Sequence, residues 1–406
     1  MSKELENNWL WLKTSIECAR WLAFQACAFR GHDESLDSKN KEIGDAKFCI
    51  LVDEAQDESK GEQMAIILNL TTLCLSFCGI SGQFPKHIFQ VPTLQMIDLS
   101  NNYLLQGSLP EFHPNGSLQS LLLHETKFSG TLPDSIGNLK MLSRIDLSFC
   151  NFNGSIPSSI ANLTQLVYLD ISSNNFTGPV PSFNMAKNMT KINLSFNNLT
   201  GQITFTHWED LQSLVELILC FNLLEGDIPT TLFSLPLLLR LELSNNQFSG
   251  QLHEFSNVSS FLLQALDLSN NNLEGPIPMS VLELRGLQTL QLSSNNFSGS
   301  FQLDVFQQLR NLSMLDLSYN SLLIEHNRTN YTFDQIVTLQ LASCKLKTFP
   351  NFWINHTTLL NLDLSNNQIH GEIPNWTFTQ FSYYIVFSRP SLQPTLGATP
   401  NTPIIF

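Results

Sequence analysis

The sequence has few charged residues, no long apolar run and no excess of positive charge. Only 14% of its 406 residues are charged, and acidic residues outnumber basic ones 35 to 21. This balance argues against a nucleic-acid surface built on bulk positive charge. The longest nearly apolar run, Met64 to Phe77, contains Asn69 and two threonines and falls short of the roughly 18–20 residues that a membrane helix needs. We therefore expect no nucleic-acid partner and no transmembrane segment in this chain.

Closely spaced cysteines are also missing. The eight cysteines lie at positions 18, 27, 49, 74, 78, 150, 220 and 344, without the paired spacing of a zinc site or the density of a disulfide scaffold. We expect buried free thiols, no metal site and no cofactor. The sequence predicts no signal peptide, because Glu17 and Arg20 interrupt the first apolar stretch and Ala26 to Ala28 is a weak cleavage site.

An internal repeat organises the chain from residue 70 to residue 375. Leu94, Ile97, Leu99 and Asn102 fit the pattern L-x-x-L-x-L-x-x-N, and successive units are 23, 24 or 25 residues apart. The thirteen units begin at Leu70, Leu94, Leu118, Leu142, Leu166, Met189, Leu214, Leu238, Leu263, Leu287, Leu312, Ile336 and Leu359. A single unit of this length buries too little to offset its backbone ordering, so the units must stack as a solenoid.

Each part of the unit predicts a local structure. Alternating apolar residues, such as Leu121 and Leu123, indicate a strand with one buried face. The following asparagine, as at Asn174, is donor and acceptor at once and can bond backbone groups of neighbouring turns. Glycine and then proline, as at Gly154 and Pro157, predict a sharp turn away from the strand. Four units replace the asparagine, with Thr126, Cys78, Cys150 and Cys344.

The unit L-x-x-L-x-L-x-x-N-x-L-x-G-x-I-P resembles the plant-specific leucine-rich repeat. The segments Met96 to Pro110 and Leu341 to Leu346, with the pair His207 and Trp208, are similar to the ectodomains of plant receptor-like proteins, notably those associated with resistance to Verticillium wilt. The resemblance implies an α/β fold, a right-handed solenoid or horseshoe with a parallel concave β-sheet. It also implies a non-catalytic immune receptor at the plasma membrane or outside the cell, which binds a peptide or protein ligand and signals with co-receptor kinases.

The amino terminus has no repeat and has a different resemblance. A helix is predicted from Leu5 to Phe29 and a buried strand from Phe48 to Asp53. The segments Trp21 to His32 and Asp53 to Lys60 resemble plant proteins derived from hAT-family transposases, in which the position of Asp53 holds a catalytic metal. Two-metal chemistry needs several converging carboxylates, which a segment of this length does not supply, so a solvated acidic turn is the alternative reading and no enzyme is expected.

We therefore predict three regions. Residues 1–68 form a transposase-like segment, of which residues 1–60 pack poorly on the solenoid. Residues 69–375 form about thirteen repeats, and residues 376–406 form a partly disordered tail. The chain departs from the receptor pattern in lacking paired-cysteine caps, an island domain and a membrane helix. We interpret it as a fusion of a transposase remnant with an ectodomain fragment, whose weakly capped ends favour self-association.

Sites for N-glycosylation are frequent and confined to residues 69–375. The candidate asparagines are Asn115, Asn153, Asn162, Asn175, Asn188, Asn257, Asn296, Asn311, Asn327 and Asn355. Asn193 also has the motif, but it lies between two strand leucines, where a sugar would project from the concave face. We expect this site to be poorly used.

The outward positions of the strands predict a binding face. A column of acids flanked by Arg144, Lys191 and Arg240 would attract a basic peptide or protein, and aromatic residues are the expected hot spots. The candidate residues are Asp98, His124, Asp146, Phe149, Asp170, Phe196, Phe221, Glu242, Asp267, Asp316, Tyr319 and Asp363. The alternative, which stays open, is that Leu-Asp-Leu-Ser is simply the usual strand sequence of this repeat and that the acidic column has no binding role.

Three functions compete. The first is a protein- or peptide-recognition scaffold derived from an immune receptor-like protein. The second is a secreted inhibitor of a cell-wall-degrading enzyme, resembling plant polygalacturonase inhibitors, which carry cysteine caps and a secretion signal. The third is a transposase-derived nuclear enzyme, which the missing acids and the acidic charge disfavour. A fusion product without function is the further alternative.

Overall fold

The structure, a computed structural model, describes residues 70–114, 116–204, 206–255, 262–325, 335–347 and 358–372, with short strands at 384–386, 392–393 and 404–405. The predicted helix over 5–29, the strand before Asp53 and the predicted poor packing of residues 1–60 lie outside these residues. The chain divides into two compact units, Met1–Leu199 and Thr200–Phe406.

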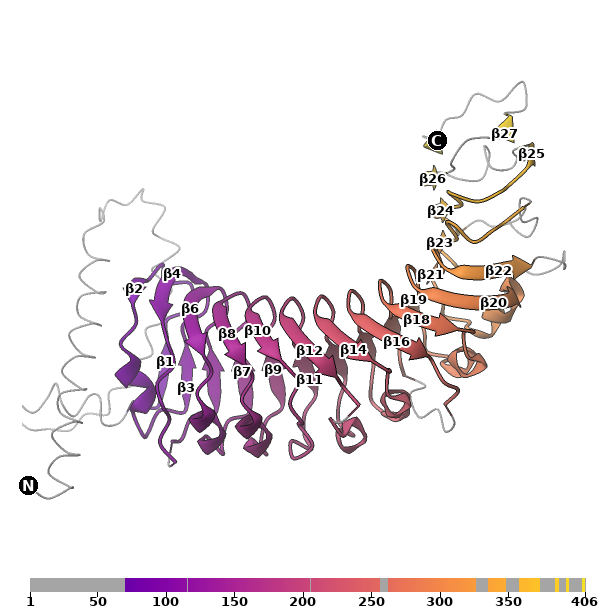
Figure 1. Cartoon of the computed structure of the whole chain (residues 1–406). Helices are drawn as coiled ribbons and strands as arrows, with labels where there is room; N and C mark the ends of the chain where they lie inside the picture. Colours follow the sequence, from indigo (N-terminus) through magenta and orange to yellow (C-terminus); the bar gives the residue numbers. More distant parts are fainter. Residues whose placement is uncertain are drawn as a thin grey trace, which may run out of the picture. The chain divides into compact units, whose positions relative to one another are not determined.

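In the first unit each repeat contributes one short strand to a parallel sheet (Figure 1). The central leucine or isoleucine of each strand lies beside that of the next, with Leu73 opposite Ile97 and Ile97 opposite Leu121. These strands are β1 (Thr72–Cys74), β3 (Met96–Asp98), β5 (Ser120–Leu122), β7 (Arg144–Asp146), β9 (Tyr168–Asp170) and β11 (Lys191–Asn193). Consecutive parallel strands confirm the predicted stacking of the repeats.

The second unit has the same arrangement, and its parallel pairs likewise place leucines side by side, such as Leu241 opposite Leu266. Its strands are β13 (Glu216–Ile218), β15 (Arg240–Glu242), β17 (Ala265–Asp267), β19 (Thr289–Gln291), β21 (Met314–Asp316), β23 (Thr338–Gln340) and β24 (Asn361–Asp363). In both units, we call the outward-pointing first and third residues of these strands the concave face.

Two strands continue this pairing beyond residue 375. Strand β26 (Tyr384–Val386) pairs in parallel with β24, and β28 (Ile404–Ile405) pairs with β26. A further short pair joins β25 (Gly371–Glu372) to β27 (Leu392–Gln393). The sequence predicted a partly disordered tail over residues 376–406 and did not predict β27 and β28, because no Leu-x-x-Leu spacing marks them.

A second row of parallel strands follows the asparagine of each repeat. In the first unit these are β2 (Ser81–Gln83), β4 (Asn102–Gly107), β6 (Thr126–Thr131), β8 (Asn151–Ser155) and β10 (Asn175–Gly178), and β12 (Asn198–Gln202) spans the unit boundary. In the second unit they are β14 (Leu223–Gly226), β16 (Gln247–Gln251), β18 (Asn272–Gly275), β20 (Asn296–Gln302) and β22 (Ser321–Glu325). Gly178, at the end of β10, has a φ of +77°, which a side chain would strain.

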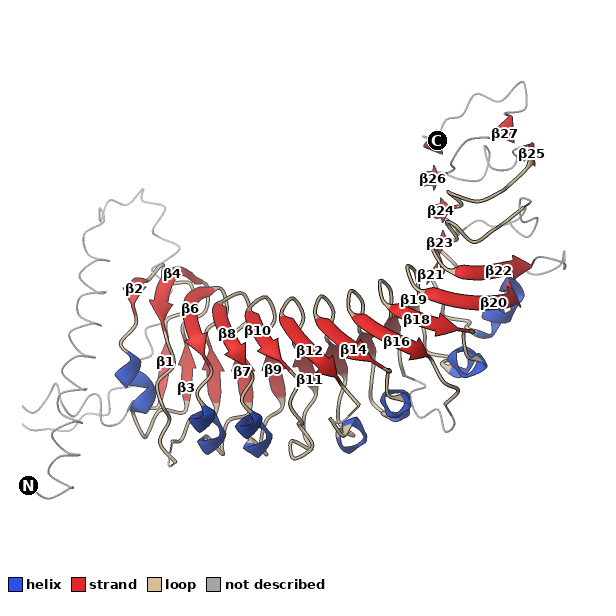
Figure 2. Cartoon of the chain, in the orientation of Figure 1, coloured by secondary structure: helices blue, strands red, loops and turns tan. Residues whose placement is uncertain are grey.

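Short 3-10 helices form the return connections, drawn blue in Figure 2. They are η2 (Lys86–Gln90), η3 (Asp134–Asn138), η4 (Ser158–Asn162), η5 (Trp208–Asp210), η6 (Thr230–Ser234), η7 (Met279–Glu283) and η8 (Leu303–Gln308). Five of them directly follow a proline: Pro85, Pro133, Pro157, Pro229 and Pro278. Proline fits there because its fixed φ suits the start of a helix and its missing N–H would find no intrahelical acceptor.

The core consists of the predicted leucines and a set of phenylalanines. Leu121, Leu123, Leu266 and Leu268 are fully buried, as predicted for the inward pairs. In most second-row strands the residue two positions after the asparagine, or after the residue that replaces it, is also buried. It is phenylalanine in several of them: Phe128, Phe152, Phe176, Phe248 and Phe297. In β4 the residue at this position, Leu104, is exposed, and Leu105 is buried instead.

The asparagine column is hydrogen-bonded as predicted. The Asn174 side-chain oxygen accepts the backbone N–H of Phe152 at 2.9 Å, and its Nδ2 donates to the carbonyls of Leu147 at 2.7 Å and Ile171 at 3.1 Å. Two of these three partners belong to the preceding repeat. One buried amide therefore joins two repeats and satisfies backbone groups that water cannot reach.

The cysteines of this column are free and buried. Cys150 and Cys344 form no disulfide, and their thiols face the carbonyls of Leu123 at 3.1 Å and Leu317 at 3.5 Å. Burial raises the pKa of Cys150 to about 11, against a smaller lowering by its hydrogen bond with Thr126. Burial, with the nearby Asp316, raises the pKa of Cys344 to about 12.

These thiols predict a loss of stability at alkaline pH. Their ordinary pKa is 9.0, so above that pH the unfolded chain releases protons that the folded chain keeps, and the free energy of unfolding falls as pH rises towards about 11. Urea unfolding across this range should show the decline, and a variant with both Cys150→Thr and Cys344→Thr should show a shallower one. Equal slopes for the two proteins would contradict the assignment.

Candidate functional site on the concave face

Most of the predicted acidic column has a structural task. The Asp170 Oδ1 atom accepts the backbone N–H of Ser172 at 3.1 Å and its hydroxyl at 2.6 Å, and Asp146 binds Ser148 in the same way. Asp146, Asp170 and Asp316 are each under a tenth exposed. Burial raises the pKa of the Asp316 carboxyl, while hydrogen bonds from Ser293 and Ser318 oppose that rise. These carboxylates brace the turn after each strand.

The remaining acids of the column are more accessible. Asp98, Glu242, Asp267 and Asp363 are half-buried, although Asp98, Asp267 and Asp363 also bind the serine two residues later. The signal for this bracing was present in the sequence, because an aspartate followed two residues later by serine is a common turn motif. Accessible charge on this face is therefore concentrated on fewer residues than the sequence suggested.

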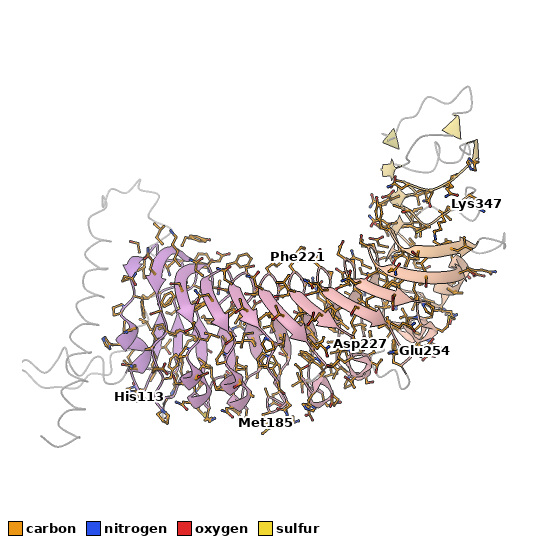
Figure 3. The ribbon with its side chains drawn as sticks, viewed as in Figure 1. His113, Met185, Phe221, Asp227, Glu254 and Lys347 are labelled. Carbon is orange, nitrogen blue, oxygen red and sulfur yellow. The ribbon has the colours of Figure 1, made fainter. Side chains whose placement is uncertain are left out.

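The predicted aromatic candidates lie beside the strands and not on them. Phe149, Phe196, Phe221 and Tyr319 occupy the turn that follows each strand, where the backbone has a φ of +52° to +56°. They are between 45% and 61% exposed, and Figure 3 shows Phe221 on the edge of the second unit opposite Glu254. Phe77 has the same backbone conformation and is 72% exposed, so it belongs to this row although it was not predicted from the sequence.

Aromatic residues in this conformation cost stability. Left-handed backbone costs an L-residue roughly 1–2 kcal/mol, and asparagine tolerates it best after glycine. We therefore expect Phe149→Asn to raise the free energy of unfolding by up to about 1 kcal/mol, because the exposed ring contributes little burial and Asn245 and Asn270 fill the same position in other repeats. Chemical denaturation measures the change. The reciprocal variant Asn270→Phe should lose stability, and a loss in Phe149→Asn would contradict the argument.

His124 stands where most repeats have the bracing serine. Its own strand offers Leu122 in place of an aspartate, so the ring turns towards the next repeat, with Nδ1 3.6 Å from the Asp146 carboxylate. Its Nε2 lies 3.0 Å from the Asn101 amide. The structure thus brings together two of the predicted candidates, His124 and Asp146.

A basic and aromatic line crosses the first unit. The Arg144 guanidinium lies 3.9 Å from the centre of the Tyr168 ring, and the Lys191 ammonium lies 5.3 Å from it on the neighbouring strand. Both cations were predicted from the sequence as flanking residues, whereas Tyr168, which lies between them in register, was not predicted. The sequence signal for this contact was that Tyr168 lies one repeat after Arg144, at the equivalent strand position.

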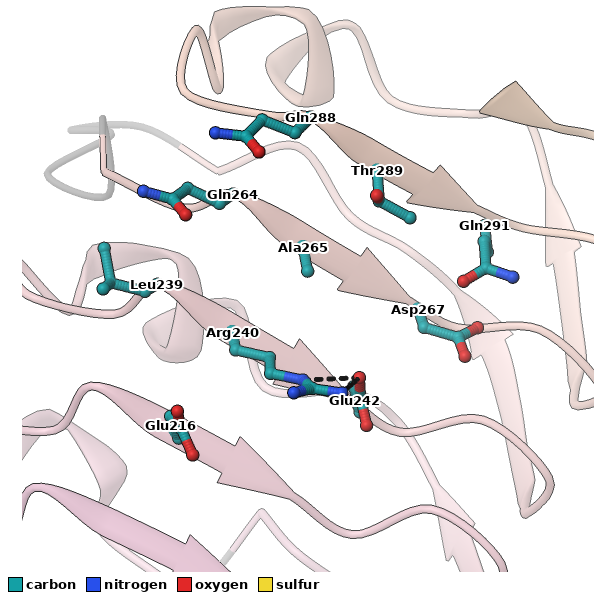
Figure 4. Close-up of a pocket in the computed structure, with 10 residues that line it drawn as sticks. All are labelled: Glu216, Leu239, Arg240, Glu242, Gln264, Ala265, Asp267, Gln288, Thr289 and Gln291. Carbon is teal, nitrogen blue, oxygen red and sulfur yellow. Dashed lines mark hydrogen bonds and ion pairs between the residues drawn. The ribbon is translucent and has the colours of Figure 1, made fainter. Parts of the chain in front are cut away.

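The second unit has a hollow of about 460 Å³ on its concave face. Its floor is Ala265, which lies in register between Arg240 and Thr289. Figure 4 shows Glu242 and Asp267 on the edge where the strands end. The Arg240 side chain bonds Glu242 through Nε at 2.6 Å and a terminal nitrogen at 2.5 Å.

The described candidate glycosylation sites lie on the surface. The exposed asparagines are Asn153, Asn162, Asn175, Asn188, Asn296 and Asn311, whereas Asn115, Asn257, Asn327 and Asn355 lie outside the described residues. Asn153 and Asn175 are register neighbours in β8 and β10, so sugars on both would emerge side by side from the second row of strands.

Asn193 should be poorly occupied in secreted protein. Its Nδ2 donates to Asp170 at 2.9 Å and its Oδ1 accepts from Ser195. A sugar on that nitrogen would break the bond to Asp170, and molecules carrying it should fold less well. Glycopeptide mass spectrometry on secreted protein should find sugar at Asn162 and little at Asn193, and equal occupancy would show that the contact is dispensable.

Within the described residues, no group of three or more His, Cys, Asp or Glu side chains is arranged to hold a metal ion. No helix in that part of the chain has both the length and the hydropathy to span a membrane.

Comparison with known proteins identifies the repeats. Leucine-rich-repeat family models match residues 69–91, 117–139, 141–163, 165–184, 261–322 and 358–379. The family described as "ZMYM1/FAM200, RNase-like domain" matches residues 1–42, in agreement with the predicted transposase-derived segment. Receptor like protein 24 of Arabidopsis thaliana is 36% identical over 287 residues, which cover 70% of this chain and 33% of that protein. Receptor-like protein 49 is 46% identical over 169 residues, covering 42% and 20%.

Solved structures agree with these matches. The ectodomain of the Arabidopsis receptor kinase HAESA, in complex with an IDA peptide hormone, has a TM-score of 0.69 and 30% identity, covering 79% of this chain and 57% of that one. The plant peptide hormone receptor RGFR1, in complex with RGF2, has a TM-score of 0.68 and 26% identity, covering 78% and 54%. The chain spans about a third of the length of receptor like protein 24. It is therefore a leucine-rich-repeat protein homologous to plant receptor-like proteins, and its amino-terminal segment matches the ZMYM1/FAM200 RNase-like family.

Proposed function

We propose that this chain is a non-catalytic scaffold that recognises a peptide or protein through its concave face, as part of cell-surface perception in a plant. Its site of action is then the plasma membrane or the extracellular space, and co-receptor kinases are its expected signalling partners. The family resemblance supports these assignments, since leucine-rich-repeat receptor ectodomains are generally non-catalytic.

The observation that carries the proposal is a line of cationic and aromatic side chains on the concave face. Arg144, Tyr168 and Lys191 form a line of cation and aromatic groups on adjacent strands. Arginine and tyrosine are enriched among residues that dominate binding energy at interfaces. The solved structures support the same proposal, because HAESA and RGFR1 were each solved in complex with a peptide hormone.

A sugar placed on the concave face tests the proposal. Asp98→Asn in the first unit and Asp267→Asn in the second each create an N-glycosylation motif, because Leu and Ser follow both aspartates. The asparagine keeps the oxygen that binds the serine. Asn193 has the same place on its strand and is expected to be poorly used, so glycopeptide mass spectrometry first measures the occupied fraction of each variant, and any loss of affinity is assigned to that fraction. Full-length protein should be secreted behind an added signal peptide and used to select binders from a random peptide library.

We expect the selected peptides to lose at least about tenfold in affinity for a glycosylated variant. The matched control is the same variant made without sugar in bacterial cells, which should bind as the parent does. Peptides that bind parent and both glycosylated variants equally would exclude the concave face as the binding surface.

A further inference from the structure

The hollow over Ala265 has a specific physical origin. Outward first-column residues along β13, β15, β17 and β19 are Glu216, Arg240, Ala265 and Thr289. Alanine is the smallest of these, and the Arg240 side chain turns along its own strand to Glu242. The space over Ala265, which a larger residue at that position and an outward-pointing Arg240 side chain would fill, therefore stays open.

The charges around the hollow favour a cation. Arg240 is compensated by Glu242, through two nitrogens within 2.6 Å of one carboxylate oxygen. Glu216 and Asp267 then leave the lining with a net negative charge. Asp267 uses Oδ1 to brace Ser269, and a carboxylate has acceptor sites beyond that oxygen. These acids would repel an anionic ligand group, because the Arg240 charge is already compensated by Glu242. They would attract a cationic group.

The rest of the lining suits a peptide backbone. Gln264, Gln288 and Gln291 lie around the hollow (Figure 4). Each glutamine amide donates and accepts hydrogen bonds, which matches the alternating N–H and C=O groups of an extended peptide. The hollow has no aromatic wall among its lining residues, so its selectivity comes from charge and hydrogen bonding.

We infer that the hollow over Ala265 receives the cationic side chain, arginine or lysine, of a peptide whose backbone is bound by the surrounding glutamines. This inference rests on the proposed function and names the chemical class that this part of the concave face recognises.

Two variants and one matched control test it. Ala265→Leu fills the hollow, and Asp267→Gln removes a charge while installing the residue that β19 has at the same position, Gln291. The control Asp363→Gln makes the same change in the same column on β24, where the aspartate also braces a serine but does not line the hollow. Circular dichroism and thermal unfolding confirm that each variant folds.

The probes are peptides selected on the full-length protein from a random library. We expect them to share one arginine or lysine, and replacing a shared arginine by uncharged citrulline, or a shared lysine by norleucine, should weaken binding by about tenfold. In Ala265→Leu and Asp267→Gln this replacement should have little effect, and in Asp363→Gln it should act as in the parent.

The outcomes separate the two proposals. Peptides that are blocked by the concave sugars but share no basic residue would overturn this inference and leave the proposed function standing. A basic residue whose replacement acts equally in parent and in Ala265→Leu would also overturn it. Failure of the library to yield any peptide blocked by the sugars would overturn the proposed function and this inference together.

Discussion

Replacement of Asn174 by alanine is expected to lower the free energy of unfolding by about 3 kcal/mol or more. The substitution leaves the N–H of Phe152 and the carbonyl of Leu147 without their buried partner, and each unsatisfied buried group costs roughly 1–3 kcal/mol. Equilibrium denaturation by urea measures the change directly.

Cys150→Asn is the matched control in the same column. Cys150 already faces the Leu123 carbonyl, and the N–H of Phe128 has only a long contact of 3.4 Å with Thr126. An amide at position 150 should hydrogen-bond both the Leu123 carbonyl and the Phe128 N–H, as Asn174 bonds the equivalent groups one repeat later. This should raise the free energy of unfolding by about 1 kcal/mol. If Asn174→Ala were nearly neutral, water would have to replace the amide, and the ladder would not hold adjacent repeats together.

Truncation of Phe176 should have a comparable effect for a different reason. The ring is fully buried and stacks on Phe152, with centroids 6.2 Å apart and planes 7° from parallel. Replacing a buried phenylalanine by alanine removes its burial and leaves a cavity, at a cost of about 3–5 kcal/mol.

Phe176→Leu should cost about 1 kcal/mol, because Leu199 and Leu273 fill the equivalent position in other repeats. The exposed Phe149 provides the second comparison, since its truncation should be nearly neutral. Similar losses for Phe176→Ala and Phe176→Leu would indicate that ring stacking, and not filled volume, stabilises this row.

The repeated elements were predictable because their physics is local or one repeat apart. Leu121 and Leu123 point inward because strands alternate, and Asn174 reaches the preceding turn because every unit has nearly the same length. Strand identity, parallel pairing and the column of buried amides follow from these two facts.

The candidate site was less predictable because it depends on backbone conformation and on neighbouring side chains. The positive φ of Phe149 moves its ring from the strand to the turn, which a pattern of apolar residues does not reveal. The hollow over Ala265 requires the adjacent Arg240 to bend towards Glu242, and a sequence does not specify that rotamer. Conversely, Asp170 was predicted to bind a ligand because it recurs in a column of acids, although its Oδ1 atom already accepts hydrogen bonds from Ser172.

The asparagine ladder also gives the array a direction. Every described amide of the asparagine column that crosses between repeats bonds the repeat before it, as Asn246 bonds the Leu219 carbonyl and the Leu224 N–H, and Asn367 bonds the Leu341 carbonyl. Deleting repeats from the carboxyl end therefore leaves backbone groups of the new last repeat without their amide partners. Deleting repeats from the amino end leaves the corresponding backbone groups of the retained repeats with theirs. Fraying is thus vectorial, and damage to one repeat loosens its predecessor in the sequence more than its successor.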